Sequence, residues 1–395
     1  MDRPARIYLD NAATSWPKPE AVYQAVDRYQ REVGAAAGRG AYVESLEAAR
    51  IVAEARRRAA RLLGAEYPHR VIFTSSGTDG LNLALHGVLR PGDHMVSSVL
   101  EHNSVLRPLE HLAAECEVSV TRVPCGSSGR VDPDDVRQAF RKNTALVAIT
   151  HASNVTGLVQ PVAEIGRLAH ERGALLLVDA AQTLGHFPFS VDELHADLLA
   201  APGHKGLLGP LGTGLLYVRP GVEARLRPTR QGGTGSESEL LHQPDLLPDR
   251  YEPGNHNLPG LAGLNAALAW IEERGLASIA EHEAALRTQA VAGLAEPDGV
   301  ALYGAGVNHA EHAPTPAAVG VLSLNVRGYD PQELAAVLDA VYGVQTRAGL
   351  HCAPLAHDAL GTLASGGALR LSWGSFTTPE EIGVAVDAIA ASAGG

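Results

Sequence analysis

Lys205 is the single lysine of the glycine-rich, otherwise uncharged stretch APGHKGLLGPLGTG, which covers residues 201–214. A lysine pressed between backbone turns and apolar residues loses hydration, which makes its neutral, nucleophilic amine easier to form. Most lysines in glycine-rich loops are instead solvated at the surface. The stretch taken alone therefore leaves both a chemical role and a surface role open.

Asp179 changes this balance, because it follows the continuous apolar run LLLV and precedes Lys205 in the chain. A carboxylate buried at the end of a strand needs a cationic partner. The pyridinium nitrogen of pyridoxal phosphate is such a partner, and this cofactor also forms a Schiff base with a lysine amine. The carboxylate would keep the ring protonated, so that the ring draws electrons from the substrate. The two residues together predict a pyridoxal 5'-phosphate site.

Other residues that could bind a ligand directly follow the predicted apolar strands. Gly77 and Thr78 lie in the turn TSSGTDGLN after VIF, where a helix begins and backbone amides suit a phosphate. His102 follows MVSSVL, Asn154 follows LVAITHA, and Gln182 lies one turn after LLLV. Ligands of open parallel sheets bind at the carboxyl ends of the strands, so we expect these residues to line one site.

The elements that must position these residues alternate from about residue 70. Apolar strands are predicted at 70–76, 94–100, 117–123, 144–152 and 174–181, with helices at 79–89, 103–115, 132–142 and 163–173. Strands that alternate with helices of this length pair in parallel through crossover connections, which predicts a three-layer α/β domain. The run ALLLVDAA is typical of a strand buried on both faces.

The pattern changes after this region. Residues 227–260 are rich in Gly, Pro, Ser and Glu and predict long loops near a site or a subunit contact. A helix at 260–275 and strands at 318–326 and 368–374 indicate a second, smaller α/β unit. We therefore predict a large domain over 15–256 and a small domain formed by 1–14 and 257–395.

Composition limits the classes of protein. The 395 residues carry a net charge of −12, which argues against a nucleic-acid or anionic-membrane partner. No run approaches the ~18 apolar residues of a spanning helix. Three cysteines without a CxxC spacing argue against a disulfide framework and a structural metal site, and we expect a cytoplasmic protein. Cys116 and Cys125 are expected to be packing residues.

Seven motifs together resemble the cysteine desulfurase and selenocysteine lyase branch of the class V aminotransferase family. They are YLDNAATSWPKPEAV, EHNSVLRP, THASNVTG, LLLVDAAQTLGH, GHKGLLGPLGTG, TRAGLHCAPLAH and ALRLSWGSFTT, in the order that the family shows and over nearly the whole chain. The resemblance implies the fold type I architecture of pyridoxal-phosphate-dependent transferases, similar to aspartate aminotransferase. It also implies a homodimer whose loops at 227–260 close over the partner's cofactor.

The resemblance also implies roles for four central residues. Lys205 would form the Schiff base with the cofactor and move protons. Asp179 would pair with the pyridine nitrogen, and His102 would stack on the ring. Arg370, in ALRLSWG, matches the arginine that binds the substrate carboxylate through a bidentate fork.

Five further residues would complete the cofactor site on the same grounds. Gln182 and Asn154 match residues that contact the ring oxygen or the substrate carboxylate. Gly77, Thr78 and His204 match residues that hold the phosphate.

Two positions depart from the family's pattern. Pro202 stands directly before GHK, where many relatives have a serine, so a hydroxyl and a backbone donor are absent. Asn255 stands in PGNHN where many relatives have a threonine that reaches the partner subunit's cofactor phosphate. An asparagine amide can also donate a hydrogen bond, so we keep Asn255 as a phosphate contact.

Cys352 distinguishes between activities, because in RAGLHCAPLAH it matches the cysteine that attacks the substrate sulfur in desulfurases similar to the Suf type. The expected function is removal of sulfur from L-cysteine, leaving alanine and a persulfide on Cys352, with selenocysteine as a further substrate. A sulfur-acceptor protein would then take the sulfur. The alternatives are an aminotransferase, lyase or epimerase of another amino acid, and a scaffold that binds the cofactor or accepts sulfur without turnover.

Overall fold

The largest sheet of the computed structural model, which describes residues 4–38, 40–126, 128–305 and 317–394, has seven strands. Their order is β2–β8–β7–β6–β5–β3–β4. The strands are β2 (Val71–Thr74), β3 (His94–Ser98), β4 (Ser119–Val123), β5 (Thr144–Thr150), β6 (Leu175–Asp179), β7 (Leu198–Pro202) and β8 (Gly214–Val218). β8 is antiparallel to both of its neighbours, and the remaining pairs are parallel.

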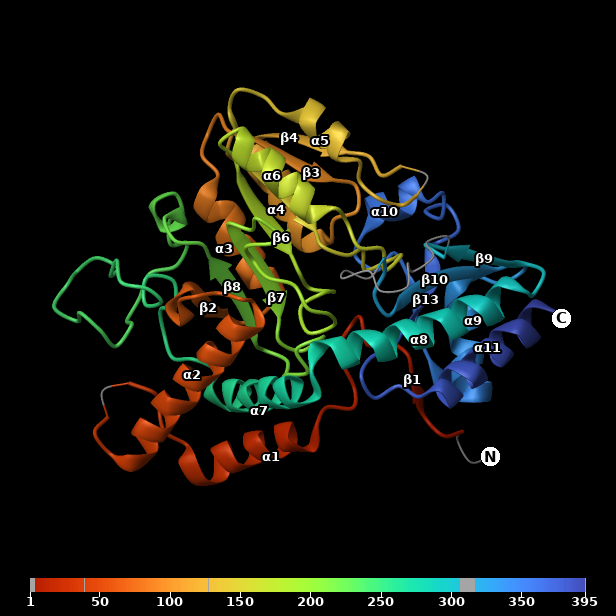
Figure 1. Cartoon of the computed structure of the whole chain (residues 1–395), viewed down its shortest axis with the longest axis horizontal. Helices are drawn as coiled ribbons and strands as arrows, with labels where there is room; N and C mark the ends of the chain where they lie inside the picture. Colours follow the sequence, from red (N-terminus) through yellow and green to blue (C-terminus); the bar gives the residue numbers. More distant parts are fainter. Residues whose placement is uncertain (1–3, 39, 127, 306–316, 395) are drawn as a thin grey trace.

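Helices cover both faces of this sheet (Figure 1). One face packs against α3 (Gly77–Val88) and α4 (Asn103–Glu115), and the other against α2 (Val43–Leu62), α5 (Pro133–Ala139), α6 (Val162–Glu171) and α7 (Leu258–Arg274). In β6, Leu176 and Val178 join one buried cluster, while Leu175 and Leu177 join the other. The strand is therefore buried on both faces, and the three-layer α/β fold is confirmed.

The sequence pattern does not predict β7 and β8, which carry the central lysine. They form an antiparallel hairpin with Pro202 opposite Gly214, and the glycine-rich stretch is the turn between them. A Cβ on Gly203 would overlap the side chain of Thr213, so only glycine allows the turn to close this tightly. A short connection returns a strand antiparallel, which makes the sheet mixed.

A second sheet is formed mostly by the last hundred residues. It has the antiparallel order β12–β13–β10–β9, with β9 (Val300–Tyr303), β10 (Val321–Val326), β12 (Arg347–Gly349) and β13 (Ala368–Ser372). Helices α8 (Leu276–Ala295), α9 (Pro331–Tyr342) and α11 (Pro379–Ala393) pack on it, on the right in Figure 1, and the short α10 (Pro354–Ala359) lies between β12 and β13 in the chain.

The beginning of the chain contacts this second sheet. β1 (Ile7–Tyr8) pairs in parallel with β11 (Val344–Gln345), and Leu9 is buried in the same cluster as Trp373. A small domain that includes both ends of the chain requires such contacts between residues 1–14 and the second sheet. The division into 15–256 and 1–14 with 257–395 stays a prediction.

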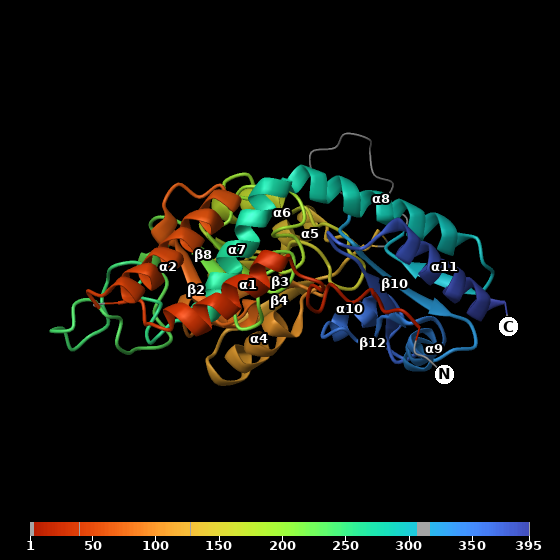
Figure 2. The same cartoon turned by 90° about the horizontal axis from the view of Figure 1, so that it is seen from below.

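The remaining elements are short. They are α1 (Glu20–Arg28), the π-helix η1 (Tyr29–Val33) that continues it, and the 3-10 helices η2 (Pro68–Arg70) and η3 (Val222–Ala224). α1 packs against α7, as both views show (Figures 1 and 2). Between η3 and α7 no helix or strand is formed by the chain, all of which is described there, and this segment projects at the left edge of both views.

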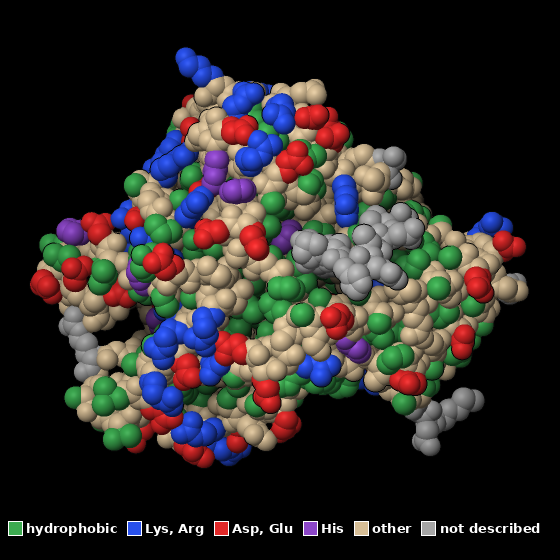
Figure 3. Space-filling view, in the orientation of Figure 1, with side chains coloured by type: hydrophobic (Ala, Val, Ile, Leu, Met, Phe, Trp, Pro, Cys, Tyr) green, Lys and Arg blue, Asp and Glu red, His purple; other side chains and the backbone are tan. Residues whose placement is uncertain are grey.

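The surface in Figure 3 shows acidic and basic side chains mixed over the visible face. Among the described helices, none combines the length and the apolar composition that crossing a bilayer requires.

Candidate active site

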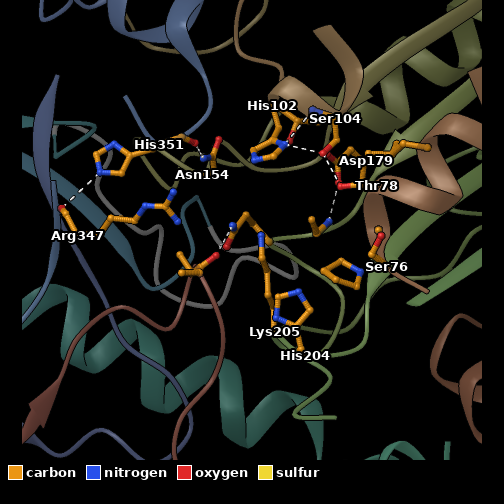
Figure 4. Close-up of a pocket in the computed structure, with 18 of the residues that line it drawn as sticks. Ser76, Thr78, His102, Ser104, Asn154, Asp179, His204, Lys205, Arg347 and His351 are labelled. Atoms are coloured by element: carbon orange, nitrogen blue, oxygen red, sulfur yellow. Dashed lines mark hydrogen bonds between the residues drawn. The ribbon is translucent and has the colours of Figure 1, made fainter. Parts of the chain in front are cut away.

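A pocket of about 210 Å³ lies where the strands of the large sheet end, between that sheet and the second one. It is shown in Figure 4. The predicted residues that line it are Gly77, Thr78, His102, Asn154, Asp179, Gln182, His204, Lys205 and Arg370. The fold therefore brings together residues that follow the ends of four strands, β2, β3, β5 and β6, with residues of the turn between β7 and β8 and one residue of β13.

Lys205 reaches this pocket from the β7–β8 turn. Burial is the main cause that lowers the pKa of its amine from the usual 10.5 to about 8. Asp179 opposes this effect, whereas the positive charges of Arg370 and Arg347 add to it. The neutral, nucleophilic form of the amine is thus accessible close to neutral pH.

Asp179 ends β6 and is only 5% exposed. One carboxylate oxygen, Oδ1, accepts a hydrogen bond from the backbone N–H of Ala181 at 2.9 Å. Burial raises the pKa of the carboxyl group, while the Ala181 amide and the charge of Lys205 lower it. A cation bound beside Asp179 would relieve the cost of burying this carboxylate.

His102 is the N-cap residue of α4. Its Nδ1 accepts a hydrogen bond from the backbone N–H of Ser104 at 3.0 Å, so the neutral ring carries its proton on Nε2. Burial, followed by the charge of Lys205, lowers the pKa of His102 to about 4. The Ser104 hydroxyl lies 2.9 Å from His102 Nδ1 and 2.8 Å from Thr78 Oγ1, which connects the ring to the first turn of α3.

The first turn of α3 forms the part of the pocket that is suited to bind an anion. Ser76 caps the helix by accepting a hydrogen bond from the N–H of Asp79 at 3.1 Å, and Gly77 and Thr78 follow in the first turn, where backbone amides have no partner within a helix. A Cβ on Gly77 would lie 3.0 Å from Cδ of Pro202, so glycine lets α3 begin close to β7. His204 lines the same pocket, and its Nδ1 is buried without a partner among the described residues.

Arg370, on β13, is 1% exposed and forms the opposite wall. Its Nη1 donates to the carbonyl of Asn154 at 3.1 Å and its Nη2 donates to Asp10 Oδ1 at 2.8 Å. Its Nε is buried with no partner within the described part of the chain. Arg347 lies directly opposite on β12, and it also lines the pocket. Two adjacent guanidinium groups are suited to bind a carboxylate.

The two side-chain amides among the predicted residues are both held by backbone carbonyls. Gln182 Nε2 donates to the carbonyl of Ala12 at 3.1 Å, and Asn154 Nδ2 donates to the carbonyl of His351 at 2.7 Å. Asn154 thereby connects the end of β5 to the residue before the predicted sulfur-accepting cysteine.

Cys352 is half-buried next to the pocket, although it is not among the described lining residues. Its Sγ lies 3.9 Å from Nη2 of Arg347, which does line the pocket. Its carbonyl accepts a hydrogen bond from the N–H of Asn103, directly after His102, at 2.6 Å. The thiol thus lies beside the site.

Asn255 does not join the pocket of its own chain. It lies in a separate hollow with Asp79, Arg230 and His256. The neighbouring Glu252 is held by a bidentate ion pair with Arg56, with Nη1–Oε1 at 2.6 Å and Nη2–Oε2 at 2.8 Å. A phosphate contact by Asn255 would therefore have to be made to another subunit, and this contact stays a prediction.

Four residues of the site were missed by the sequence reasoning. Arg347 and Ser104 lie inside the motifs TRAGLHCAPLAH and EHNSVLRP, but no local signal separates them from surface residues. Asp10 lies in YLDNAATSW and is recognised only by its contact with Arg370. Glu101, 0% exposed, lies next to His102; burial raises its pKa to about 8, and its Oε2 has no partner among the described residues.

These residues fit pyridoxal phosphate. The buried carboxylate of Asp179 suits a protonated ring nitrogen, the amine of Lys205 suits an aldehyde, and the helix-end amides with the unpartnered His204 Nδ1 suit a phosphate. The fit is judged from the charges and the hydrogen-bond donors and acceptors that line the pocket.

The sequence pattern of the aminotransferase class-V family matches residues 7–384. The chain belongs to the aminotransferase class-V family. It is 37% identical over 380 residues to a probable cysteine desulfurase of Methanothermobacter thermautotrophicus, covering 95% of this chain and 92% of that relative. The resemblance drawn from the seven motifs is confirmed.

Solved structures of this class-V branch have the same fold. The apo structure of a cysteine desulfurase from Thermococcus onnurineus NA1 superposes with a TM-score of 0.90 at 33% identity, covering 98% of this chain and 95% of that one. The Escherichia coli cysteine desulfurase CsdA, solved with an S-sulfonic acid, gives a TM-score of 0.85 at 28% identity, covering 97% and 94% of the two chains.

Proposed function

We propose that this protein is a pyridoxal-phosphate-dependent cysteine desulfurase that converts L-cysteine to L-alanine and leaves a persulfide on Cys352. The observation that carries the proposal is the position of the Cys352 thiol, 3.9 Å from an arginine that lines the same pocket as Lys205 and Asp179. The class-V family and relatives named cysteine desulfurases support it. The atoms balance, because the sulfur leaves the substrate Cβ and joins the thiol, while the carbon takes a proton.

The cofactor would be held by the residues at both ends of the pocket. Asp179 and His102 would hold the ring, Lys205 would bind the aldehyde, and the amides of Gly77 and Thr78 would receive the phosphate. When bound, the cofactor supplies an electron sink for negative charge at the substrate Cα.

Lys205 would take the Cα proton and return it during the reaction. Its lowered pKa of about 8 means that a usable fraction of the amine is neutral near physiological pH. Arg370 would orient the substrate by binding its carboxylate, since Asn154 and Asp10 already fix the guanidinium at its two Nη atoms while the buried Nε has no partner among the described residues.

Cys352 would act as the nucleophile that removes the sulfur. The thiolate attacks the substrate sulfur, the carbon–sulfur bond breaks, and a sulfur–sulfur bond forms on the enzyme. The guanidinium of Arg347, 3.9 Å from Sγ, would stabilise the negative charge of the attacking thiolate.

We infer a cytoplasmic homodimer that passes its sulfur to an acceptor protein. Large apolar side chains are exposed at the beginning of α2, where Tyr42, Val43 and Leu46 are 54%, 74% and 59% exposed, which supports a subunit contact. The three cysteines are free, which supports a reducing compartment. Sedimentation of the purified protein tests the dimer, and a fully active monomer would contradict it.

The activity is tested by incubating the cofactor-loaded protein with L-cysteine, L-selenocysteine and a panel of other amino acids. Alanine, sulfide and selenide are measured with and without a thiol reductant. We expect alanine from cysteine, in equal amounts with sulfide when reductant is present. Transamination, elimination or epimerisation of another amino acid, without alanine from cysteine, would instead establish the alternative enzyme class.

A further inference from the structure

Three polar side chains form a buried chain behind Cys352. His351 Nδ1 lies 3.1 Å from His357 Nε2, and His357 Nδ1 lies 2.8 Å from Oγ1 of Thr362. His351, His357 and Thr362 are 3%, 0% and 2% exposed. Outside this group, His351 Nε2 lies 3.4 Å from the carbonyl oxygen of Arg347. These three side chains therefore connect the loop after α10 to the beginning of β12 through His351, the residue before the cysteine.

Both imidazole rings are neutral. Burial, together with the positive charge of Arg370, lowers the pKa of His351 to about 2 and that of His357 to about 4. A neutral ring has one donor and one acceptor. Thr362 Oγ1 also lies 3.2 Å from the carbonyl oxygen of His357, and its single proton can go to that oxygen or to His357 Nδ1. If it goes to His357 Nδ1, and His357 Nε2 donates to His351 Nδ1, then His351 Nε2 donates to the Arg347 carbonyl. This arrangement pairs all four ring nitrogens, which the reverse direction does not.

The turn that these rings support has an uncommon backbone. His351 and Cys352 have φ values of +49° and +57°, so two consecutive residues other than glycine occupy the left-handed region. Such conformations persist only where the surrounding structure holds them. Asn154 holds the His351 carbonyl and the Asn103 amide holds the Cys352 carbonyl, while the His351 ring is held by His357.

We propose that His357 is a positioning residue for Cys352: through the His351 ring it holds the left-handed turn that presents the thiol beside Arg347. His357 lies on α10, five residues after Cys352, and is not among the described residues that line the pocket. The role in sulfur transfer rests on the proposed function. The geometric part of the proposal is independent of that function, because it concerns only the conformation of one turn and the accessibility of its thiol.

The geometric part is tested by alkylation of the cofactor-free protein with iodoacetamide, followed by mass spectrometry of each cysteine peptide. Cys116 and Cys125 are also free and half-buried, and they serve as internal references. In His357→Ala we expect Cys352 to be alkylated at least about threefold faster, because the turn is released, with no change at the other two cysteines. His357→Gln, which keeps a donor and an acceptor near Nε2, should restore a rate within about twofold of the wild type.

The matched control is His94→Ala. His94 is also 0% exposed and lies between two threonine hydroxyls, Thr144 Oγ1 at 2.8 Å and Thr121 Oγ1 at 2.9 Å, at the beginning of β3. It should leave the Cys352 rate unchanged. An unchanged Cys352 rate in His357→Ala, equal acceleration of all three cysteines, or the same effect from His94→Ala would overturn the proposal.

A kinetic measurement separates this proposal from the assignment of function. In the cofactor-loaded enzyme, His357→Ala should lower kcat for alanine formation from L-cysteine about tenfold or more, while KM stays within about twofold and His357→Gln recovers most of the rate. If the wild type forms no alanine, the proposed function fails while the alkylation result still decides the role of His357. A proportional rise in KM would show that His357 supports substrate binding and not the position of the thiol.

Discussion

Arg370 Nη2 donates a hydrogen bond to Asp10 Oδ1 at 2.8 Å, so a side chain near the end of the chain is fixed by one near its beginning. Asp10 also forms an isolated parallel bridge with Ser372, two residues after Arg370. The other guanidinium bond goes to the carbonyl of Asn154, at the end of the large sheet. The arginine is therefore oriented by both parts of the molecule before any substrate binds.

This orientation leads to a prediction for Arg370→Lys. A lysine ammonium cannot reproduce the planar fork, and one lost charged hydrogen bond costs about 1.5–3 kcal/mol, so KM for L-cysteine should rise about tenfold or more. The absorbance of bound cofactor should remain. Steady-state kinetics measure the effect, and Arg167→Lys, at an exposed i,i+4 ion pair with Glu171, is the control. An unchanged KM would show that Arg370 does not bind the substrate.

Lys205 should be the lysine that bonds to the cofactor. The purified protein should be yellow, lose its visible band on treatment with borohydride, and carry the reduced cofactor as added mass on Lys205. The chain has only two other lysines, Lys18 and Lys142, so the site is read directly by mass spectrometry. A label on either of them, or a protein that stays colourless after incubation with the cofactor, would contradict the assignment.

Lys18 serves as an internal control for this labelling, because the pKa of its amine is lowered as much as that of Lys205. Burial lowers the pKa of its amine to about 8, as it does for Lys205, but Lys18 Nζ donates to the carbonyl and the hydroxyl of Ser15 at 3.1 and 2.9 Å. A low pKa alone would label both lysines, whereas a cofactor site labels one. Lys205→Ala should abolish both the colour and the label.

Glu101 provides a prediction about stability and pH. Burial raises its pKa from 4.5 to about 8, so between these values the folded state keeps a proton that the unfolded state releases. The contribution of protonated Glu101 to the free energy of unfolding is therefore complete below about pH 4.5, and it is lost as the pH rises through about 8. Glu101→Gln, which is neutral at every pH, should therefore be more stable than the wild type at pH 8 by about 1 kcal/mol or more.

Chemical denaturation of the cofactor-free proteins at pH 5 and pH 8 measures this difference. The advantage of Glu101→Gln should be small at pH 5, because the wild-type carboxyl group is then mostly protonated in the fold. The control is Glu171→Gln, at an exposed ion pair, which should show no such trend. An advantage that is equal at both pH values would mean that Glu101 titrates normally.

The sequence predicts those residues of the site that directly follow a recognisable apolar strand. Asp179, His102 and Asn154 each follow a recognisable apolar run, and parallel strands place their carboxyl ends at one edge of a sheet. Lys205 is also predicted, although the strands on each side of it are not. Its turn is recognised by glycine content, whereas the direction of β8 depends on pairing with β2 and β7.

The residues that the sequence misses act through contacts between distant segments. The charged pair of Asp10 and Arg370 is 360 residues apart in the chain, and no periodicity connects them. Arg347 belongs to the site because the register of β12 on β13 places it opposite Arg370. Asn255 shows the converse, since a motif position that resembles a cofactor contact lies outside the pocket of its own chain.

The last prediction concerns Cys352 and separates the two halves of the reaction. Under the proposed function, binding the substrate and removing its α-proton would require Lys205, Asp179 and Arg370 but no thiol. Taking the sulfur away requires a nucleophile beyond the substrate sulfur. Cys352 lies next to the pocket, in a turn held by Asn103 and by the ring of the preceding histidine, so it cannot travel far with its sulfur. Wild-type turnover on cysteine alone should therefore be slow and should rise with a reductant or an acceptor protein.

Cys352→Ala should still bind the cofactor and change its absorbance when L-cysteine is added. It should lose most sulfur transfer, measured as sulfide and alanine in the presence of reductant. Release of selenium from L-selenocysteine should persist in part, because the weaker carbon–selenium bond can break without nucleophilic attack. Cys116→Ala and Cys125→Ala are the matched controls, and Lys205→Ala should lose both activities. If Cys352→Ala desulfurates cysteine at the wild-type rate, the thiol is a packing residue and the aminotransferase or lyase alternative takes its place.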